Sequence, residues 1–114
     1  MTMQLKTSPD VVAEMTRRIV VGFGPLRIIL FGSRARGDAR WDSDFDFLVV
    51  MPDGIDRRQT AVAIRRVLAG MMAPKDVIVT TPDEIARRGD MPGTVLKPAL
   101  REGIALYEYA RGAR

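Results

Sequence analysis

Two carboxylates stand one residue apart at the head of a hydrophobic segment, and this placement constrains the chain more than any other feature. The segment runs from Asp44 to Val50 and reads DFDFLVV. Side chains alternate between the faces of a strand, so Asp44 and Asp46 share one face and the phenylalanines share the other. An unpaired carboxylate inside such a strand costs on the order of several kcal/mol by desolvation. The segment therefore predicts a bound cation, unless Asp42 and Ser43 begin a simple turn-and-cap cluster.

The hydrophobic pattern predicts one small mixed β-sheet with helices packed against it, an α/β (α+β) fold. Three helices are predicted over residues 9–22, 56–72 and 91–102, the first of them with Ser8 as its N-cap. A fourth, short helix is predicted to begin after Thr81, which would be its N-cap, with Glu84 completing a capping box. The predicted strands span residues 26–31, 44–50, 75–80 and 104–107, and a helical turn is predicted from Ser33. Because 114 residues hold one core, we expect a single domain over residues 1–114.

The composition excludes several kinds of chemistry. The chain has no cysteine and no histidine, which removes disulfides, thiolate or imidazole metal sites and His-based catalysis. No apolar run reaches the roughly 18 residues of a membrane span, and no signal-peptide pattern is visible, so we expect a cytoplasmic protein without a membrane partner. The formal net charge of +4 favours an anionic partner only weakly, and we do not expect direct binding to nucleic acid.

Other polar residues are placed to face the same carboxylates. Asp76 begins the predicted strand KDVIVT, and its apolar neighbours put it at the edge of that strand. A site that offers only carboxylate oxygens, with no nitrogen or sulfur ligand, favours Mg²⁺ or Mn²⁺. Three carboxylates can bind two such ions in the arrangement used for phosphoryl transfer. Gly32 and Ser33 follow a predicted strand and begin a helical turn, where backbone amides and a hydroxyl bind phosphate.

Several of these residues have a second interpretation. Ser33 is equally suited to cap its helical turn. Arg34 and Arg36 either contact a nucleotide or partner, or are solvated loop charges. Trp41, the only tryptophan, either packs on the fold or lies exposed near the site. The arginines of the predicted helix 56–72 should form a solvated face: Arg57, Arg58, Arg65 and Arg66.

The stretch GSRARGDARWDSDFD resembles the Gly-Ser, ten residues, Asp-x-Asp motif of the DNA polymerase beta-like nucleotidyltransferase superfamily. Residues 32–37 and the aspartate of KDVIV are similar to the minimal nucleotidyltransferases (MNT family), and ALREGIALYE resembles the closing helix and strand of that family. The resemblance implies a nucleotidyltransferase fold and a single minimal domain. It also implies that Asp44 and Asp46 bind both metal ions, that Asp76 completes one metal site and helps to activate the incoming hydroxyl, and that Gly32 and Ser33 hold the triphosphate of ATP.

The same resemblance implies a function. Many small members of the family are antitoxins paired with a HEPN-domain toxin, and some adenylylate a tyrosine of that toxin. We therefore expect Mg²⁺-dependent transfer of AMP from ATP to a hydroxyl of a partner protein, a HEPN RNase toxin. The alternative is a catalytically silent antitoxin that acts by direct binding. Larger relatives carry a helical domain for which 114 residues leave no space, so we expect the partner to supply the acceptor surface.

Overall fold

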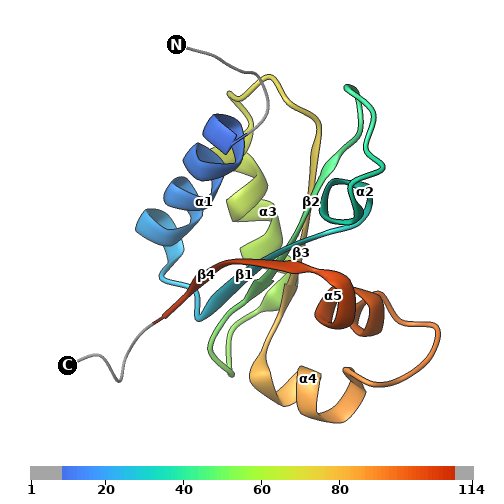
Figure 1. The fold of residues 1–114 in the computed structure, drawn as a ribbon. Coiled ribbons are helices and arrows are strands. Elements are labelled where there is room, and N and C mark those ends of the chain that lie inside the picture. Colours follow the sequence, from blue (N-terminus) through green and yellow to red (C-terminus); the bar gives the residue numbers. More distant parts are fainter. Residues whose placement is uncertain (1–8, 110–114) are drawn as a thin grey trace.

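A computed structural model describes residues 9–109, and within them the chain forms one mixed sheet flanked by helices (Figure 1). The elements follow in the order α1 (Pro9–Phe23), β1 (Arg27–Phe31), α2 (Ser33–Arg36), β2 (Phe45–Val50), α3 (Arg57–Leu68), β3 (Lys75–Thr80), α4 (Pro82–Arg88), α5 (Leu96–Glu102) and β4 (Ile104–Glu108). This is the predicted order of helices and strands, and the predicted α/β fold class is confirmed.

The strand order of the sheet is β3-β2-β1-β4. β1 runs antiparallel to β2 and to β4, whereas β2 and β3 are parallel. The register pairs Phe31, the last residue of β1, with Asp46 of β2, and it pairs Asp46 with Asp76 of β3. The end of β1 and the beginnings of β2 and β3 therefore meet at the same end of the sheet.

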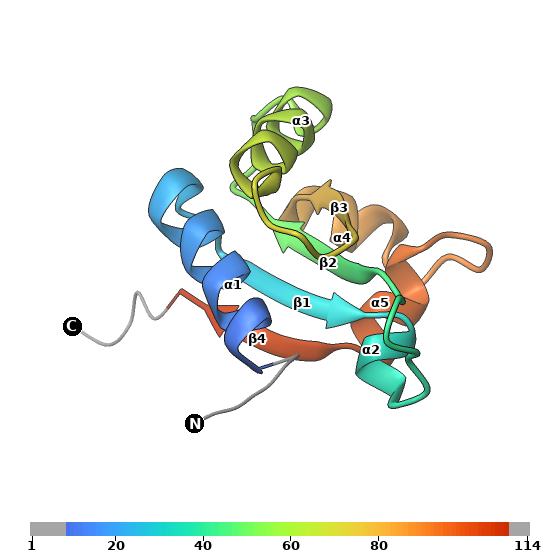
Figure 2. The ribbon, with the colours of Figure 1, turned by 90° about the horizontal axis from the view of Figure 1, so that it is seen from above.

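Helices cover both faces of the sheet, as the views in Figure 1 and Figure 2 show. α1 and α3 lie on one face over the main hydrophobic core, and α5 lies on the other over a smaller core. The main core contains Met15, Ile19, Ile28, Leu30, Phe45, Phe47, Val49, Met51, Ala61, Ile64, Leu68, Val77 and Val79. The smaller core contains Ile29, Leu48, Leu96 and Ala99.

β2 shows the predicted alternation of its side chains. Phe45 and Phe47 point into the main core, whereas Leu48 is buried in the smaller core on the opposite face. Asp46 lies two residues before Leu48 and shares its face. The carboxylate of Asp46 is thus placed where the α5 side of the sheet passes from solvent into a packed interior.

The predicted start of the last helix is wrong by about one turn. α5 begins at Leu96, whereas the apolar spacing favoured a start at Met91. Pro92 and Gly93 form a turn, because proline cannot donate a helical hydrogen bond and glycine weakens a helix. The hydroxyl of Thr94 donates to the carbonyl of Met91 at 2.9 Å and closes this turn.

The ends of the other helices differ less from the predicted ends. α3 ends at Leu68 and not at residue 72, since Gly70 interrupts the helical sequence. The predicted N-cap Ser8 lies outside the described residues. Among the helices that the structure describes, none combines the length and the apolar character needed to cross a membrane.

Candidate active site

Three carboxylates lie at the end of the sheet where β2 and β3 begin. Asp46 is half-buried, while Asp44 and Asp76 are exposed. Burial raises the pKa of Asp46, and the negative charges of Asp44 and Asp76 raise this pKa further, while Arg36 opposes the shift. The three carboxylates therefore share one electrostatic environment, which is the like-charge conflict that the sequence predicted.

Gly32 forms a tight corner against the carboxylate of Asp46. Its φ of 77° and ψ of −157° lie in a region that is essentially restricted to glycine. A Cβ atom at this position would overlap Oδ2 of Asp46. No other residue type fits between the end of β1 and this carboxylate without a shift of one of them.

Ser33 is the first residue of α2, and its carbonyl accepts from the amides of Gly37 and Asp38. The residue before the helix is Gly32, whose carbonyl accepts from the amides of Ala35 and Arg36, so Ser33 is not the N-cap. Among the described residues, its hydroxyl makes no hydrogen bond, and the first-turn amides of Ser33 and Arg34 have no backbone partner. One hydroxyl and two amides are thus available to an anion beside Asp46.

Arg34 has a structural role in the loop before β2. Its guanidinium donates to the carbonyls of Ser43 at 2.8 Å and Trp41 at 3.2 Å. It also lies over the ring of Phe45, 4.2 Å from the ring centroid. Because Phe45 faces away from Asp46 along β2, the guanidinium of Arg34 is held on the other side of the sheet from that carboxylate.

Arg36 and Trp41 differ from Arg34 in their exposure. Arg36 is exposed and pairs with Asp38 at 3.4 Å, yet its charge lowers the pKa of Asp46. Of the two arginines predicted to contact the nucleotide, Arg36 is therefore the one whose charge acts on Asp46. Trp41 is 87% exposed, so the structure favours exposure of this side chain over packing on the fold.

Asp76 is held by other groups, and this bears on the predicted metal site. Its Oδ1 accepts from the amide of Val77 at 3.0 Å and from Nη2 of Arg65 at 3.4 Å. Within residues 9–109, no three acidic side chains are gathered closely enough to hold a metal ion. The donor set still fits a hard divalent cation, since its side chains offer only oxygen atoms. The pKa of Asp46 is raised first by burial and then by the charges of Asp44 and Asp76, and a bound cation would offset both effects. The metal site stays a prediction.

The sequence did not reveal a buried carboxylate at the far end of β3. Thr81 caps α4 as predicted, with its hydroxyl accepting from the amide of Glu84 at 3.2 Å. The buried carboxylate of Glu84, however, accepts from the hydroxyl of Thr80 at 2.6 Å and forms ion pairs with Arg57 and Arg88. The pair of Glu84 with Arg88 has the i,i+4 spacing of a helix, but no spacing rule connects residue 57 with residue 84, so only the tertiary fold shows that contact.

Glu84→Gln is expected to lower the free energy of unfolding by about 1–3 kcal/mol at neutral pH, the usual cost of losing a charged hydrogen-bond partner. Burial by itself raises the pKa of Glu84, but hydrogen bonds from Arg57 and Thr80 outweigh it, and the pKa lies below its ordinary value. This contribution is therefore present above the ordinary pKa of about 4.3 and is lost as the pH falls further.

Urea denaturation between pH 3 and pH 7 measures this effect, with the exposed Glu102→Gln as the matched control. The difference between the wild-type chain and Glu84→Gln should shrink toward pH 3. A difference that stays constant over this range would contradict the assigned charge interaction.

The fold resembles solved nucleotidyltransferase structures. A candidate nucleotidyltransferase from Sulfolobus solfataricus superposes with a TM-score of 0.61 over 90% of this chain and 81% of the other, at 21% identity. A variant of the toxin–antitoxin complex MntA–HpeT gives a TM-score of 0.58 over 96% of this chain and 77% of the other, at 20% identity. A toxin–antitoxin structure with AMP-PNP gives a TM-score of 0.51 over 93% of this chain and 77% of the other, at 21% identity.

At 20–21% identity, these structural similarities show a shared fold and nothing more. A comparison with curated proteins gives no match. The family is shown by the sequence itself. A family model described as "Nucleotidyltransferase domain" matches residues 13–104, which include β1, β2 and β3 and every predicted site residue. The chain therefore belongs to the nucleotidyltransferase domain family.

Proposed function

We propose that this protein transfers AMP from ATP to a hydroxyl, most specifically a tyrosine hydroxyl, of a partner protein and so neutralises a HEPN RNase toxin. The observation that carries the proposal is the corner formed by Gly32, Ser33 and Asp46, with Asp44 and Asp76 beside it, on a nucleotidyltransferase fold. This corner combines groups for phosphate binding with carboxylates for a cation.

The turn after β1 would bind the triphosphate of ATP. Gly32 lets the backbone approach a bulky anion, and the hydroxyl and amide of Ser33 would donate to phosphate oxygens. Arg36 is exposed close enough to influence Asp46 and would meet the outer phosphates. Arg34 would act indirectly, since its guanidinium is committed to the carbonyls of Trp41 and Ser43.

The carboxylates would handle the cation and the acceptor. Asp44 and Asp46 would hold Mg²⁺, and Asp76 would complete the site and draw the proton from the attacking hydroxyl. When bound, Mg²⁺ supplies positive charge that offsets the charge of the triphosphate. The acceptor oxygen bonds to the α-phosphorus as the bond from that phosphorus to the α,β-bridging oxygen breaks, and pyrophosphate leaves.

The choice of partner is supported by two kinds of similarity. The motif of residues 32–46 resembles the MNT family, and two structures with the same fold are toxin–antitoxin structures, one of them with AMP-PNP. A second candidate is an antitoxin that acts by binding alone. It is favoured by the finding that, within residues 9–109, no three acidic side chains lie close enough together to hold a metal ion.

The experiment incubates the purified protein with the product of its neighbouring gene, ATP and Mg²⁺, followed by intact-mass spectrometry of both chains. Added mass in multiples of AMP on the neighbour, absent with Asp44→Asn, supports the transferase. A stable complex without added mass, formed equally by Asp44→Asn, supports the binding antitoxin.

Ser33→Ala is expected to weaken ATP binding by about 1–3 kcal/mol, since it removes one hydrogen bond to a charged phosphate. The free energy of unfolding should stay within about 0.5 kcal/mol of the wild-type value, because the Ser33 hydroxyl makes no hydrogen bond to the described residues. Isothermal titration calorimetry with ATP measures the first quantity and urea denaturation the second. Unchanged ATP affinity would remove Ser33 from the site.

A further inference from the structure

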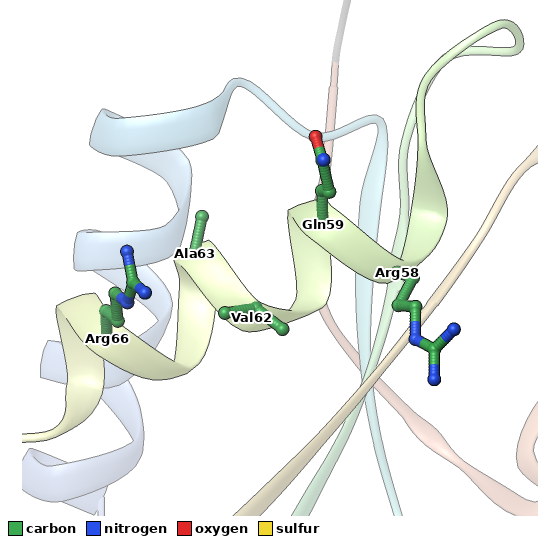
Figure 3. A pocket seen from close by; sticks show the side chains of 5 residues that line it. All are labelled: Arg58, Gln59, Val62, Ala63 and Arg66. Atoms are coloured by element: carbon green, nitrogen blue, oxygen red, sulfur yellow. The ribbon is translucent and has the colours of Figure 1, made fainter.

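Arg65 differs from the neighbouring arginines of α3. Arg58 and Arg66 line a shallow cavity of about 420 Å³ on the outer side of that helix (Figure 3). Neither of them forms an ion pair within residues 9–109. Arg65 is 48% exposed by side chain, as the sequence predicted for a solvated face, but its guanidinium reaches the edge strand β3.

Arg65 closes a ring of hydrogen bonds around one residue of that edge. Its Nη2 donates to the carbonyl of Val77 at 2.9 Å and to Oδ1 of Asp76 at 3.4 Å. The amide of Val77 donates to the same Oδ1 at 3.0 Å. The free backbone groups of Val77 are thus both satisfied by side chains, and Oδ1 of Asp76 accepts two hydrogen bonds.

The ring has a consequence for the second oxygen of the carboxylate. With Oδ1 tied to the strand, the Asp76 side chain is held in one orientation, and its Oδ2 takes no part in the ring. Asp76 is paired in register with Asp46 and adds to the raised pKa of that residue, so the held carboxylate stands beside the candidate site. We propose that Arg65 is a positioning residue that fixes the carboxylate of Asp76 for the transfer reaction, an inference that rests on the proposed function.

A purely structural interpretation of the ring makes a different prediction. Edge strands are protected when their free amides and carbonyls are covered, and Arg65 does this at Val77 whether or not Asp76 is used in catalysis. An exposed ion pair contributes little to stability. Loss of an edge cap alone would therefore leave both the order of the Asp76 side chain and the chemical step unchanged.

The experiment compares Arg65→Gln and Arg65→Lys with Arg66→Gln as the matched control. The first readout is the set of three-bond Hα–Hβ couplings of Asp76 by NMR, which report its χ1 rotamer without ATP, metal or partner. We expect one rotamer in the wild-type chain and in Arg66→Gln, and averaged couplings in Arg65→Gln. Arg65→Lys should restore part of the order, because lysine keeps the charge but not the planar fork.

The second readout separates kcat from KM for ATP in the AMP-transfer assay. Arg65→Gln should lower kcat by roughly 10–100-fold, the usual cost of removing a hydrogen-bond partner of a carboxylate ligand, while KM changes little and Arg66→Gln behaves as wild type. Unchanged couplings, an unchanged kcat or a raised kcat in Arg65→Gln would each overturn the inference. If the wild-type chain transferred no AMP, the proposed function and the catalytic part of this inference would fall together, and the couplings would still decide whether Arg65 orders Asp76.

Discussion

Asp46→Asn is expected to reduce AMP transfer by at least roughly 10³-fold, because charge stabilisation in phosphoryl transfer amounts to several kcal/mol and depends on carboxylates that hold the cation. Asp46 is the carboxylate whose pKa both Asp44 and Asp76 raise, it pairs in register with Asp76, and Gly32 packs directly against it. The assay is the mass-spectrometric transfer assay with partner protein, ATP and Mg²⁺.

The same variant should keep its fold and equal or exceed the wild-type free energy of unfolding in metal-free buffer at pH 7. The pKa of Asp46 is raised in the folded chain by burial and by two neighbouring carboxylates, so its ionised form disfavours folding. This penalty is present above the folded pKa and disappears as the pH falls below the ordinary value of about 3.9. The advantage of Asp46→Asn should therefore fade toward pH 3.

The exposed Asp90→Asn is the matched control, since it makes the same chemical change away from the site. It should leave transfer and stability unchanged. Wild-type transfer by Asp46→Asn would contradict the assignment of this carboxylate. Loss of transfer together with a large loss of stability would show instead that Asp46 supports the fold.

The arrangement of β1, α2 and β2 was predictable because each feature is local in sequence. Hydrophobic runs bounded by glycine and proline define the strands. Strand alternation puts Asp46 on the opposite face from Phe45. Gly32 and Ser33 directly follow β1, and Asp46 lies at the start of β2. Once these two strands pair antiparallel, the turn after β1 lies close to Asp46.

The contacts that the sequence did not reveal all join residues from different elements. Arg57 and Glu84 come from α3 and α4, and Arg65 reaches Asp76 across the edge of β3. A solvated arginine and an arginine that binds a distant carboxylate have the same helical spacing, so the pattern alone favoured solvent. Arg34 is a similar case. Its position just after Gly32 and Ser33 favoured a phosphate contact, and nothing in the sequence indicated that its guanidinium would donate to the carbonyls of Trp41 and Ser43.

Gly32→Ala is expected to reduce transfer by at least roughly 10²-fold, the effect of misplacing a reacting or binding group by about 1 Å. The added Cβ would overlap Oδ2 of Asp46, so either this carboxylate or the turn that begins at Ser33 must move. The backbone conformation adds about 1–3 kcal/mol of destabilisation, because alanine strongly disfavours this region. Transfer activity and urea denaturation measure the two effects.

Two comparisons separate the overlap from the backbone strain. Gly37→Ala introduces a side chain at another positive φ, 89°. Among the described residues, no atom lies within 4 Å of this new Cβ. The Gly37→Ala variant should therefore lose about 1–2 kcal/mol of stability and retain AMP transfer. In an Asp46→Ala background, Gly32→Ala should destabilise less than in the wild-type chain, by a coupling of about 0.5–3 kcal/mol, because the overlapping carboxylate is gone. An equal cost in both backgrounds would mean that strain alone excludes other residues at position 32, and that the contact between this turn and Asp46 places no demand on the sequence.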